Sequence, residues 1–453
     1  MIRKLLIANR GEIVSRIIRT CRVMGIATVA VYSEPDRNAP YLKEADEAVL
    51  IGPANPLQSY LNMDALLEAA RRTGAEAVHP GYGFLSERGL FAEAVVNAGL
   101  IWVGPAPQVL RTISSKSYCR QLAHEVEVPV IPGTLELLNE ASEIKDYGRR
   151  QGYPLFIKLD RGGGGKGIEV VHSEDQAEEV FQRAASIGQM AFGHAGCYIE
   201  AVVAQPRHIE IQFLADSFGN CVCLSERECS IQRRHQKIIE ESPSVVVGED
   251  ERRELFDRTR RLVRRMGYQG AGTIENLRSA DGRFYFMEIN ARLQVEHPVT
   301  EFLTGVDIVR CQLEIASGEK LAFGQADVTR QGHAVEARVY AEDPDTFFPS
   351  PGTISALELP AESDHLRIDH ALADQGVIPP YYDPLLAKVI AWDHTRPQAV
   401  ERLVQALKDF RIEGVKTTIP ANLKILEHPR FLTGDFTTAF IHEMLGEKPT
   451  VET

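Results

Sequence analysis

Two glutamates that could hold a metal ion, Glu275 and Glu288, lie on either side of Asp281-Gly282. Asp-Gly between apolar-rich runs is the strongest short signal for a β-hairpin turn. If these two residues form the loop, counting back along both strands places Glu275 opposite Glu288. Two carboxylates about 5 Å apart on neighbouring strands repel by about 3 kcal/mol at an effective dielectric constant near 20. The pattern therefore predicts that a cation offsets this pair.

Three polar residues continue the chain after Glu288. Because side chains alternate along a strand, Asn290 and Arg292 are expected on the face of Glu288, and Gln294 can follow them. Mg²⁺ and Mn²⁺ prefer oxygen ligands, which two carboxylates and the amide of Asn290 supply. The alternative is a solvated hairpin face on which Arg292 is the counter-ion.

A second candidate site is the glycine run Asp160-Arg-Gly-Gly-Gly-Gly-Lys-Gly167. It matches Gly-x-Gly-x-x-Gly, but strand-like Ile168–Val171 follows where a dinucleotide fingerprint needs a helix. The P-loop pattern also fails, because Gly167 occupies the Ser/Thr position. The run predicts a glycine hairpin whose backbone N–H groups fold over phosphates, with Lys158 and Lys166 on either side. The alternative is an unspecific mobile loop.

Strands and helices alternate along residues 2–104, and two of the loops between them could bind a ligand. Strands are predicted at 2–9, 27–32, 48–51, 77–79 and 101–104, with helices from 11, over 64–72 and near 91–97. This alternation predicts parallel β-α units in an open sheet. Residues 9–12 and 79–84 follow strands, where ligands usually bind, although both could be simple tight turns.

The pattern changes near residue 115, where a helix begins at Ser115-Lys116, and again near 330. Residues 208–212 predict a strand with His208, Glu210 and Gln212 on one face. Residues 225–237 are so rich in charged side chains that they indicate a solvated loop rather than core. Residues 397–410 predict an amphipathic helix.

Bulk composition limits the function. The 453 residues carry a net charge of −13, which argues against binding nucleic acid through bulk electrostatics. Seven cysteines without zinc-site spacing indicate reduced thiols and a cytoplasmic location. No signal peptide opens the chain and no apolar run is long enough to span a membrane.

Four long motifs together resemble the biotin carboxylase family of the ATP-grasp superfamily. They are His79-Pro-Gly-Tyr-Gly-Phe-Leu-Ser-Glu87, Glu226-Arg-Glu-Cys-Ser-Ile-Gln-Arg-Arg-His-Gln-Lys237, Arg292-Leu-Gln-Val-Glu-His-Pro-Val-Thr-Glu301 and Ala341-Glu-Asp-Pro344. The resemblance implies a multidomain α/β and α+β fold. A Rossmann-like N-terminal domain (1–114) would precede an ATP-grasp core (115–330) with a mobile glycine-rich lid subdomain (about 131–203). A C-terminal biotin carboxylase domain (331–446) would complete the site.

The resemblance also implies the nucleotide and metal sites. Matching positions that would bind ATP are Lys116, Lys158, Gly163, Gly164, Gly165, Lys166, Gly167, Glu200, Ala201, Val203, His208, Gln232 and His235. The implied ligands of Mg²⁺ or Mn²⁺ are Glu275, Glu288 and Asn290, in agreement with the hairpin argument. Ala201 stands where the family often has Lys, Asp160-Arg161 replace small residues before the lid loop, and Ala291 replaces Thr or Pro.

The remaining matches imply the reaction. Lys237, Arg292, Gln294 and Val295 would hold bicarbonate, and Lys237 and Arg292 would also be catalytic. Glu296 would be the general base, and Arg338 with Tyr82 would bind biotin. Bicarbonate would attack the γ-phosphate to form carboxyphosphate, which breaks down to carbon dioxide and phosphate. The phosphate would then deprotonate the ureido nitrogen that takes up the carbon dioxide.

Family members act on biotin attached to a carrier marked by Met-Lys-Met, and no Met-Lys dipeptide occurs in this chain. We therefore expect the carrier and the carboxyltransferase to be separate polypeptides, and the chain itself to be a homodimer. Length favours the acetyl-CoA carboxylase of bacteria, whereas Tyr382–Lys388 is closer to urea or other acyl-CoA carboxylases. Rival hypotheses are a carbamoyl-phosphate-synthetase-like ligase, which needs no biotin, and a non-catalytic nucleotide-binding regulator.

Overall fold

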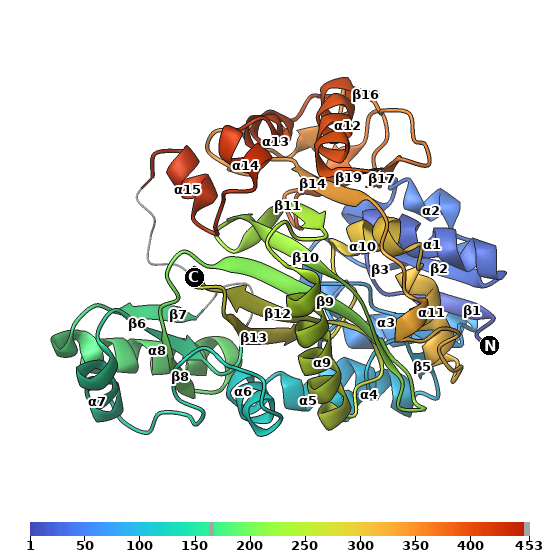
Figure 1. The fold of residues 1–453 in the computed structure, drawn as a ribbon. Helices are drawn as coiled ribbons and strands as arrows, with labels where there is room; N and C mark the ends of the chain where they lie inside the picture. Colours follow the sequence, from blue (N-terminus) through green and yellow to red (C-terminus); the bar gives the residue numbers. More distant parts are fainter. Residues whose placement is uncertain (163–166, 448–453) are drawn as a thin grey trace.

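The computed structural model describes residues 1–162 and 167–447 and arranges them around two large β-sheets (Figure 1). The N-terminal sheet has the order β3-β2-β1-β4-β5, and all its strand pairs are parallel. Its strands are β1 (Lys4–Ile7), β2 (Ala27–Ser33), β3 (Glu47–Gly52), β4 (Ala77–His79) and β5 (Ile101–Trp102). The predicted open parallel sheet is therefore confirmed.

Helices connect these strands, as the alternation of the sequence predicts. They are α1 (Glu12–Met24), α2 (Tyr41–Glu44), α3 (Met63–Thr73), α4 (Gly89–Asn97) and α5 (Pro107–Ile113). The apolar stripe of α1, from Ile13 to Cys21, is buried against the sheet. The loops after β1 and β4 touch each other, because Asn9 Nδ2 donates to the carbonyl oxygens of Pro80 and Tyr82 at 2.7 Å.

The second sheet has eight strands in the order β13-β12-β9-β10-β11-β14-β19-β17, and every neighbouring pair is antiparallel. The strands are β9 (Arg207–Ala215), β10 (Cys221–Arg233), β11 (Gln236–Ser242), β12 (Gly270–Arg278), β13 (Phe284–Asn290), β14 (His333–Tyr340), β17 (Leu366–His370) and β19 (Leu385–Asp393). Strand β11 precedes residue 330, where the sequence pattern changes, and β14 follows it. Because these two strands pair, the sheet contains strands from both sides of that residue.

A smaller sheet, β7-β6-β8, stands apart at the lower left of Figure 1 with helices α7 and α8. Its elements are β6 (Leu155–Leu159), β7 (Ile168–Val171), β8 (Cys197–Ala201), α7 (Ser142–Gln151) and α8 (Ala177–Phe192). The strand β7 confirms that the glycine run leads into a strand and excludes the dinucleotide-binding motif. Residues 163–166 of that run lie outside the described residues.

The remaining elements cover the sheets. They are α6 (Lys116–Glu125), α9 (Glu249–Met266), α10 (His297–Thr304), α11 (Ile308–Ala316), α12 (Arg396–Asp409), α13 (Ile419–Leu426), α14 (Pro429–Thr433), α15 (Phe440–Met444), β15 (Gly352–Thr353), β16 (Ala356–Glu358), β18 (Val377–Ile378) and β20 (Arg411–Glu413). The helix predicted at 397–410 is α12, and its apolar stripe is buried.

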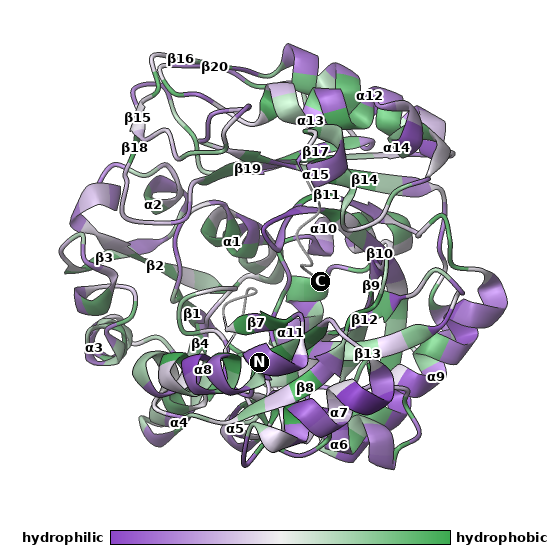
Figure 2. Ribbon diagram, turned by 90° about the vertical axis from the view of Figure 1, so that its left-hand side faces the viewer, coloured by the Kyte–Doolittle hydropathy of each residue, from purple (hydrophilic) through white to green (hydrophobic). Residues whose placement is uncertain are grey.

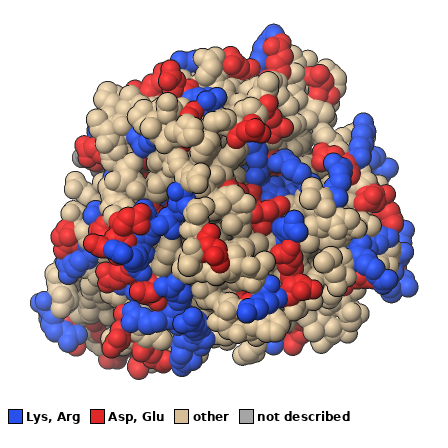
Figure 3. Space-filling model, turned by 45° about the vertical axis from the view of Figure 1, so that its right-hand side comes forward, with Lys and Arg blue, Asp and Glu red and all other residues tan. Residues whose placement is uncertain are grey.

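Charged side chains are spread among uncharged ones on the visible surface. Helix α9 is purple along much of its surface in Figure 2, and both signs of charge are interspersed on the face shown in Figure 3. Among the described residues, no helix is both long and apolar enough to cross a lipid bilayer.

The prediction of a solvated loop at 225–237 is wrong. Residues 221–232 of β10 are buried, and β10 pairs with β9 on one side and β11 on the other. The charged side chains are tolerated because they pair with opposite charges inside the protein, as Arg227 does with Glu210.

The hairpin of β12 and β13 pairs Glu275 with Glu288, as predicted, although its loop differs from the prediction. Ser279 N donates to Arg283 O at 2.9 Å, so the loop is the three residues 280–282, with Gly282 at φ 87°. A register shift between Glu275 and Asn276 leaves one extra residue on β13 and restores the expected pairing.

This loop generates a prediction about stability. Gly282→Ala should lower the free energy of unfolding by about 1–2 kcal/mol, because a residue with a Cβ is disfavoured at this left-handed φ. Urea denaturation of both proteins measures the difference. Unchanged stability would show that the loop has no need of a left-handed residue at 282.

Candidate active site

Lys116 and Glu288 form the first ion pair of the site, at 3.1 Å between Nζ and Oε2. Ser115 caps helix α6, accepting a hydrogen bond from Tyr118 N, and so fixes Lys116 as the first helical residue. Burial by itself would lower the pKa of Lys116, but Glu288, Glu200 and Glu275 outweigh it and raise the pKa. The predicted neighbourhood of lysine and hairpin carboxylate is therefore present.

Glu275, opposite Glu288, lies among three nitrogen-bearing side chains. His208 Nε2 lies 3.1 Å from Oε2, while Lys237 Nζ at 3.0 Å and Gln294 Nε2 at 3.1 Å both reach Oε1. Burial favours the neutral form of Glu275, but Lys237 and His208 prevail and hold its pKa well below the usual value. Side-chain cations thus already balance both glutamates, and repulsion between them does not by itself require a metal ion.

Arg292 forms hydrogen bonds with side chains at and beyond the end of β13 and with the loop after β4. Its guanidinium donates to Asn290 Oδ1 at 3.0 Å, to Gln294 Oε1 at 2.8 Å and to Glu87 Oε2 at 3.0 Å. Asn290, Arg292 and Gln294 are thus neighbours, but β13 ends at Asn290, so the strand face predicted for Glu288 does not extend to Arg292 and Gln294. Glu87, from the loop after β4, is a partner that the sequence did not single out.

The oxygen atoms of Glu275, Glu288 and Asn290 fit a hard divalent cation such as Mg²⁺ chemically. Two compact groups of ligand-type side chains also lie nearby, each with its atoms within 4.8 Å of one another in the described part of the chain. They are His208, Glu210 and Glu275, and Glu210, Cys229 and Glu296. Neither group includes Glu288, so Glu275 and Glu288 do not belong together to one of these compact groups.

Glu296 is held between two cations. Lys237 Nζ lies 2.6 Å from Oε1 and Arg338 Nη2 lies 2.9 Å from Oε2. Burial opposes the charge of Glu296, but Lys237, Arg338 and Arg227 overcome this effect and hold its pKa well below the usual value. Glu296 is therefore ionised at neutral pH and can accept a proton.

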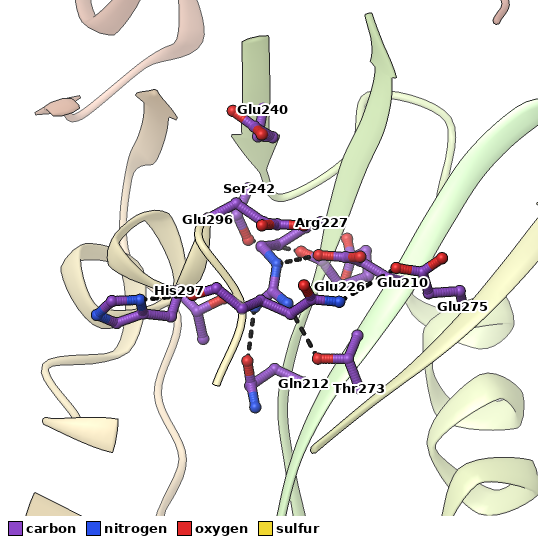
Figure 4. Close-up of polar contacts among 12 residues, drawn as sticks. Glu210, Gln212, Glu226, Arg227, Glu240, Ser242, Thr273, Glu275, Glu296 and His297 are labelled. Carbon is purple, nitrogen blue, oxygen red and sulfur yellow. Dashed lines mark hydrogen bonds and ion pairs between the residues drawn. The ribbon is translucent and has the colours of Figure 1, made fainter. Parts of the chain in front are cut away.

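Lys237 is the common partner of three carboxylates. Besides Glu296 and Glu275, it contacts Glu210 Oε2 at 2.6 Å. Burial by itself would lower the pKa of Lys237, but the three carboxylates raise it well above the usual value. In Figure 4, Glu210 and Glu275 lie side by side, with Glu296 directed toward the same region.

Arg227 lies beneath this cluster and was not predicted as a site residue. It is completely buried and contacts Glu210 (Figure 4), and it donates to Gln212 Oε1 at 2.8 Å and to Thr273 Oγ1 at 3.2 Å. Glu210 and Gln212 belong to the polar face predicted for residues 208–212. The alternation of polar residues at 208–212 was the signal available in the sequence. It did not indicate that Arg227 on β10 pairs with Glu210.

Glu240 and Glu336 are two further buried carboxylates that the sequence did not indicate. They are direct partners across β11 and β14, and Arg338 Nε donates to Glu240 Oε1 at 2.6 Å. Burial, opposed by Arg338 and reinforced by Glu296, raises the pKa of Glu240 to about 7. Burial also raises the pKa of Glu336 well above its usual value.

Glu200 forms a separate, fully buried centre at the end of β8. Arg120 Nη1 and Lys158 Nζ each lie 2.6 Å from one of its oxygens. Ala201 ends the strand and its N–H donates to Pro132 O at 2.7 Å, and Val203 is half-buried beyond it. Arg120 was not predicted, because helix α6 brings it to Glu200 from a distant part of the sequence.

The remaining site residues predicted from the sequence lie on several other elements. Gln232 and His235 lie on the hairpin of β10 and β11, and Tyr82 contacts Glu12 through its hydroxyl. Val295 accepts a hydrogen bond from Lys388 Nζ at 2.9 Å through its carbonyl. Gly167 lies next to β7, where its carbonyl accepts from Leu159 N at 2.9 Å. Gly163, Gly164, Gly165 and Lys166 are outside the described residues.

The buried centre at Glu200 predicts a large effect on stability. Glu200→Ala should lower the free energy of unfolding by about 3–5 kcal/mol, because it leaves Arg120 and Lys158 buried without their partner. Glu358→Ala is a matched control, since Glu358 pairs with Arg411 in solvent and its loss should matter far less. Equal shifts of the two variants in urea denaturation would contradict the prediction.

Comparisons with known proteins cover nearly the whole chain. Three family models match it: biotin carboxylase, N-terminal domain, over residues 1–110; carbamoyl-phosphate synthase L chain, ATP binding domain, over 115–323; and biotin carboxylase C-terminal domain over 336–443. The biotin carboxylase of Halalkalibacterium halodurans is 45% identical over 448 residues, which are 99% of each chain.

Solved structures agree with this result. A biotin carboxylase from Campylobacter jejuni in complex with β-γ-ATP superposes with a TM-score of 0.95 at 40% identity, covering 98% of this chain and 99% of that one. The biotin carboxylase domain dimer of Hydrogenobacter thermophilus 2-oxoglutarate carboxylase, in complex with MgADP, ADP and bicarbonate, gives 0.94 at 40% identity, covering 99% and 100%. The chain therefore belongs to the biotin carboxylase family, and its activity is the ATP-dependent carboxylation of biotin.

Proposed function

We propose that this chain carboxylates biotin carried on a separate protein, and that Glu296 is the general base of the reaction. The observation that carries the assignment is the pairing of Glu296 with Lys237 and Arg338, one cation on each oxygen. A base in this position is ionised, shielded from water and surrounded by groups that attract anions. Bicarbonate is such an anion, and it is a poor nucleophile until it loses its proton.

Bicarbonate would bind beside Lys237, Arg292, Gln294 and the backbone of Val295. Its negative charge would draw Lys237 and Arg292 toward itself, which weakens their hold on Glu296 and makes that carboxylate a stronger base. Glu296 then takes the proton of bicarbonate. A bicarbonate oxygen forms a bond to the γ-phosphorus of ATP as the bond to the bridging oxygen of ADP breaks, and the product is carboxyphosphate.

The nucleotide phosphates would lie against Lys116 and Lys158. The other residues proposed to bind ATP are those of the glycine-rich run 163–167, residues 200–203, His208, Gln232 and His235. Both lysines now pair with carboxylates, at 3.1 and 2.6 Å. These pairs hold the lysines at the site and balance their charge when no phosphate is bound. Mg²⁺ or Mn²⁺ on Glu275, Glu288 and Asn290 would supply positive charge to the phosphate oxygens.

Biotin would bind beside Arg338 and Tyr82. Carboxyphosphate loses carbon dioxide, and the released phosphate takes the proton from the ureido nitrogen, which then bonds to the carbon dioxide. Arg338 would stabilise the negative charge on the ureido oxygen. Glu240 supports this role, because its Oε1 contacts both Nε and Nη2 of Arg338, at 2.6 and 2.5 Å, and so fixes the guanidinium.

We also propose a division into domains at about 115 and 330, a homodimer, and the acetyl-CoA carboxylase system of the cytoplasm as the setting. The three family matches and the similar domain described as a dimer support the first two. All seven cysteines are free and buried, which suits a reducing compartment. Urea or another acyl-CoA as final acceptor is the second candidate, favoured by Tyr382–Lys388.

The first test is ATP hydrolysis in the presence of Mg²⁺. Hydrolysis should depend on bicarbonate and should rise when free biotin is added, with carboxybiotin as a product. Hydrolysis that ignores biotin would favour a carbamoyl-phosphate-synthetase-like reaction instead. Co-purification of a separate biotinylated protein tests the proposed partner.

The base assignment predicts that Glu296→Ala lowers bicarbonate-dependent turnover by about a hundredfold or more. ATP binding should change little, because Glu296 contacts Lys237 and Arg338 rather than the phosphate lysines. Turnover like that of the wild type, measured at saturating ATP, would remove Glu296 from this role.

Arg338 predicts a different outcome. Arg338→Ala should continue to cleave ATP with bicarbonate but should form much less carboxybiotin per ATP, because only the biotin step has lost its cation. The ratio of carboxybiotin to phosphate measures this coupling. A ratio equal to that of the wild type would contradict the assignment.

A further inference from the structure

A polar cavity of about 220 Å³ lies beside the proposed biotin site. Its lining includes Arg233, Arg234, Gln236, Tyr340, Glu342 and Phe347. We call it the Glu342 cavity. No role proposed above involves this cavity, although its wall adjoins residues of the reaction centre.

Glu342 supplies the carboxylate of the cavity. Only 8% of the residue is exposed, yet within residues 1–162 and 167–447 no hydrogen bond or ion pair partners its side chain. Burial, followed by the nearby charge of Asp383, raises the pKa of Glu342 to about 7, against a smaller opposing effect of Arg233. The carboxylate lines the cavity and receives no hydrogen bond from the described part of the protein, so a ligand in the cavity can supply the donor.

Arg233 supplies the opposite chemistry. Its guanidinium lies over the ring of Phe347 at 4.4 Å, and its buried Nε has no acceptor among the described residues. The cavity therefore combines an acceptor without a donor and a donor without an acceptor. Phe347 and Ile238 give it an apolar wall between these two groups.

The backbone around the cavity is strained. Arg234 and His235, the two-residue turn between β10 and β11, have φ values of 50° and 62°, and Phe347 has 58°. Each non-glycine residue in this region costs of the order of 1–3 kcal/mol, and such residues concentrate at binding sites. Arg234 and Phe347 line the cavity, whereas His235 is the second residue of the hairpin turn, where a left-handed φ is usual.

The cavity lies on the biotin side of Arg338. Tyr340, in its wall, accepts a hydrogen bond from Arg338 Nη1 at 3.4 Å, and Gln236 precedes Lys237 in β11. Asp383 interacts electrostatically with Glu342, with Tyr340 and with Tyr82. A molecule that extends from the ureido site between Arg338 and Tyr82 thus has the Glu342 cavity beside its path.

We propose that the Glu342 cavity binds the amide through which biotin is attached to its carrier, and that it discriminates against free biotin. This inference rests on the proposed function. An amide offers the N–H that Glu342 lacks and the carbonyl oxygen that Arg233 lacks. Free biotin ends in a carboxylate at the same position, and this group meets the negative charge of Glu342.

The test compares free biotin with biotin N-methylamide in carboxybiotin formation, on the wild type, Glu342→Gln and the control Glu358→Gln. Glutamine keeps an acceptor for the amide and removes the charge that repels the free acid. At about pH 8, Glu342→Gln should therefore raise kcat/KM for free biotin roughly fivefold and change that for the amide less than about twofold. Glu358 lies in solvent, and its variant should match the wild type.

The pH dependence of the wild type gives a second measurement that needs no variant. Glu342 is neutral below its pKa of about 7 and ionised above it, while the carboxylate of free biotin stays ionised throughout. The preference for the amide should therefore grow as the pH rises from about 6 to about 8. The other charged or titratable groups beside Glu342 are Arg233, Arg234, Asp383 and Tyr340, and His235 lies in the adjoining turn.

Two outcomes would overturn the inference. Equal effects of Glu342→Gln on both substrates would remove the cavity from substrate discrimination, as would a preference for the amide that is independent of pH in the wild type. Failure of the proposed function is distinguishable, because neither substrate would then be carboxylated by the wild type.

Discussion

The site depends on one ammonium group that balances three buried carboxylates. Lys237 holds Glu210, Glu275 and Glu296 within 3.0 Å, and each of these glutamates has a further nitrogen-bearing partner: Arg227, His208 and Arg338 respectively. Buried charges are stable only in such balanced sets. The arrangement places a lysine that attracts anions against the base that must deprotonate one of them, so substrate binding and activation of the base use the same side chain.

Much of the fold and part of the site could be predicted from the sequence. Regular alternation of strands and helices fixed the parallel sheet, because each period is visible within a few residues. The facing pair of Glu275 and Glu288 was also predicted, although for a reason that was only partly right. The loop is one residue longer than Asp-Gly suggests, and a bulge in β13 compensates for it. The predicted loop was one residue too short, and the predicted strand lacked the one-residue bulge. The two errors cancelled, so the predicted pairing was still correct.

Other features depend on contacts between distant parts of the chain and left no local signal. The charged residues of β10 suggested solvent, because their partners on β9 and α9 are not adjacent in sequence: Arg227 pairs with Glu210, and Glu226 with Arg252. Glu240 and Glu336 become neighbours only through the pairing of β11 with β14. A sequence shows which residues are charged, whereas burial and pairing decide which of those charges can do chemistry.

The continuous eight-stranded sheet has a consequence for how the chain can be divided. Strands β14, β19 and β17 come from the region after residue 330, yet β14 supplies Arg338 and pairs along β11. A fragment that ends before β14 would expose the backbone N–H and C=O groups of β11 as an open edge, and such edges promote aggregation. The two sequence regions on either side of residue 330 thus share one sheet although they match separate family models, and genetic truncation near residue 330 would break that sheet.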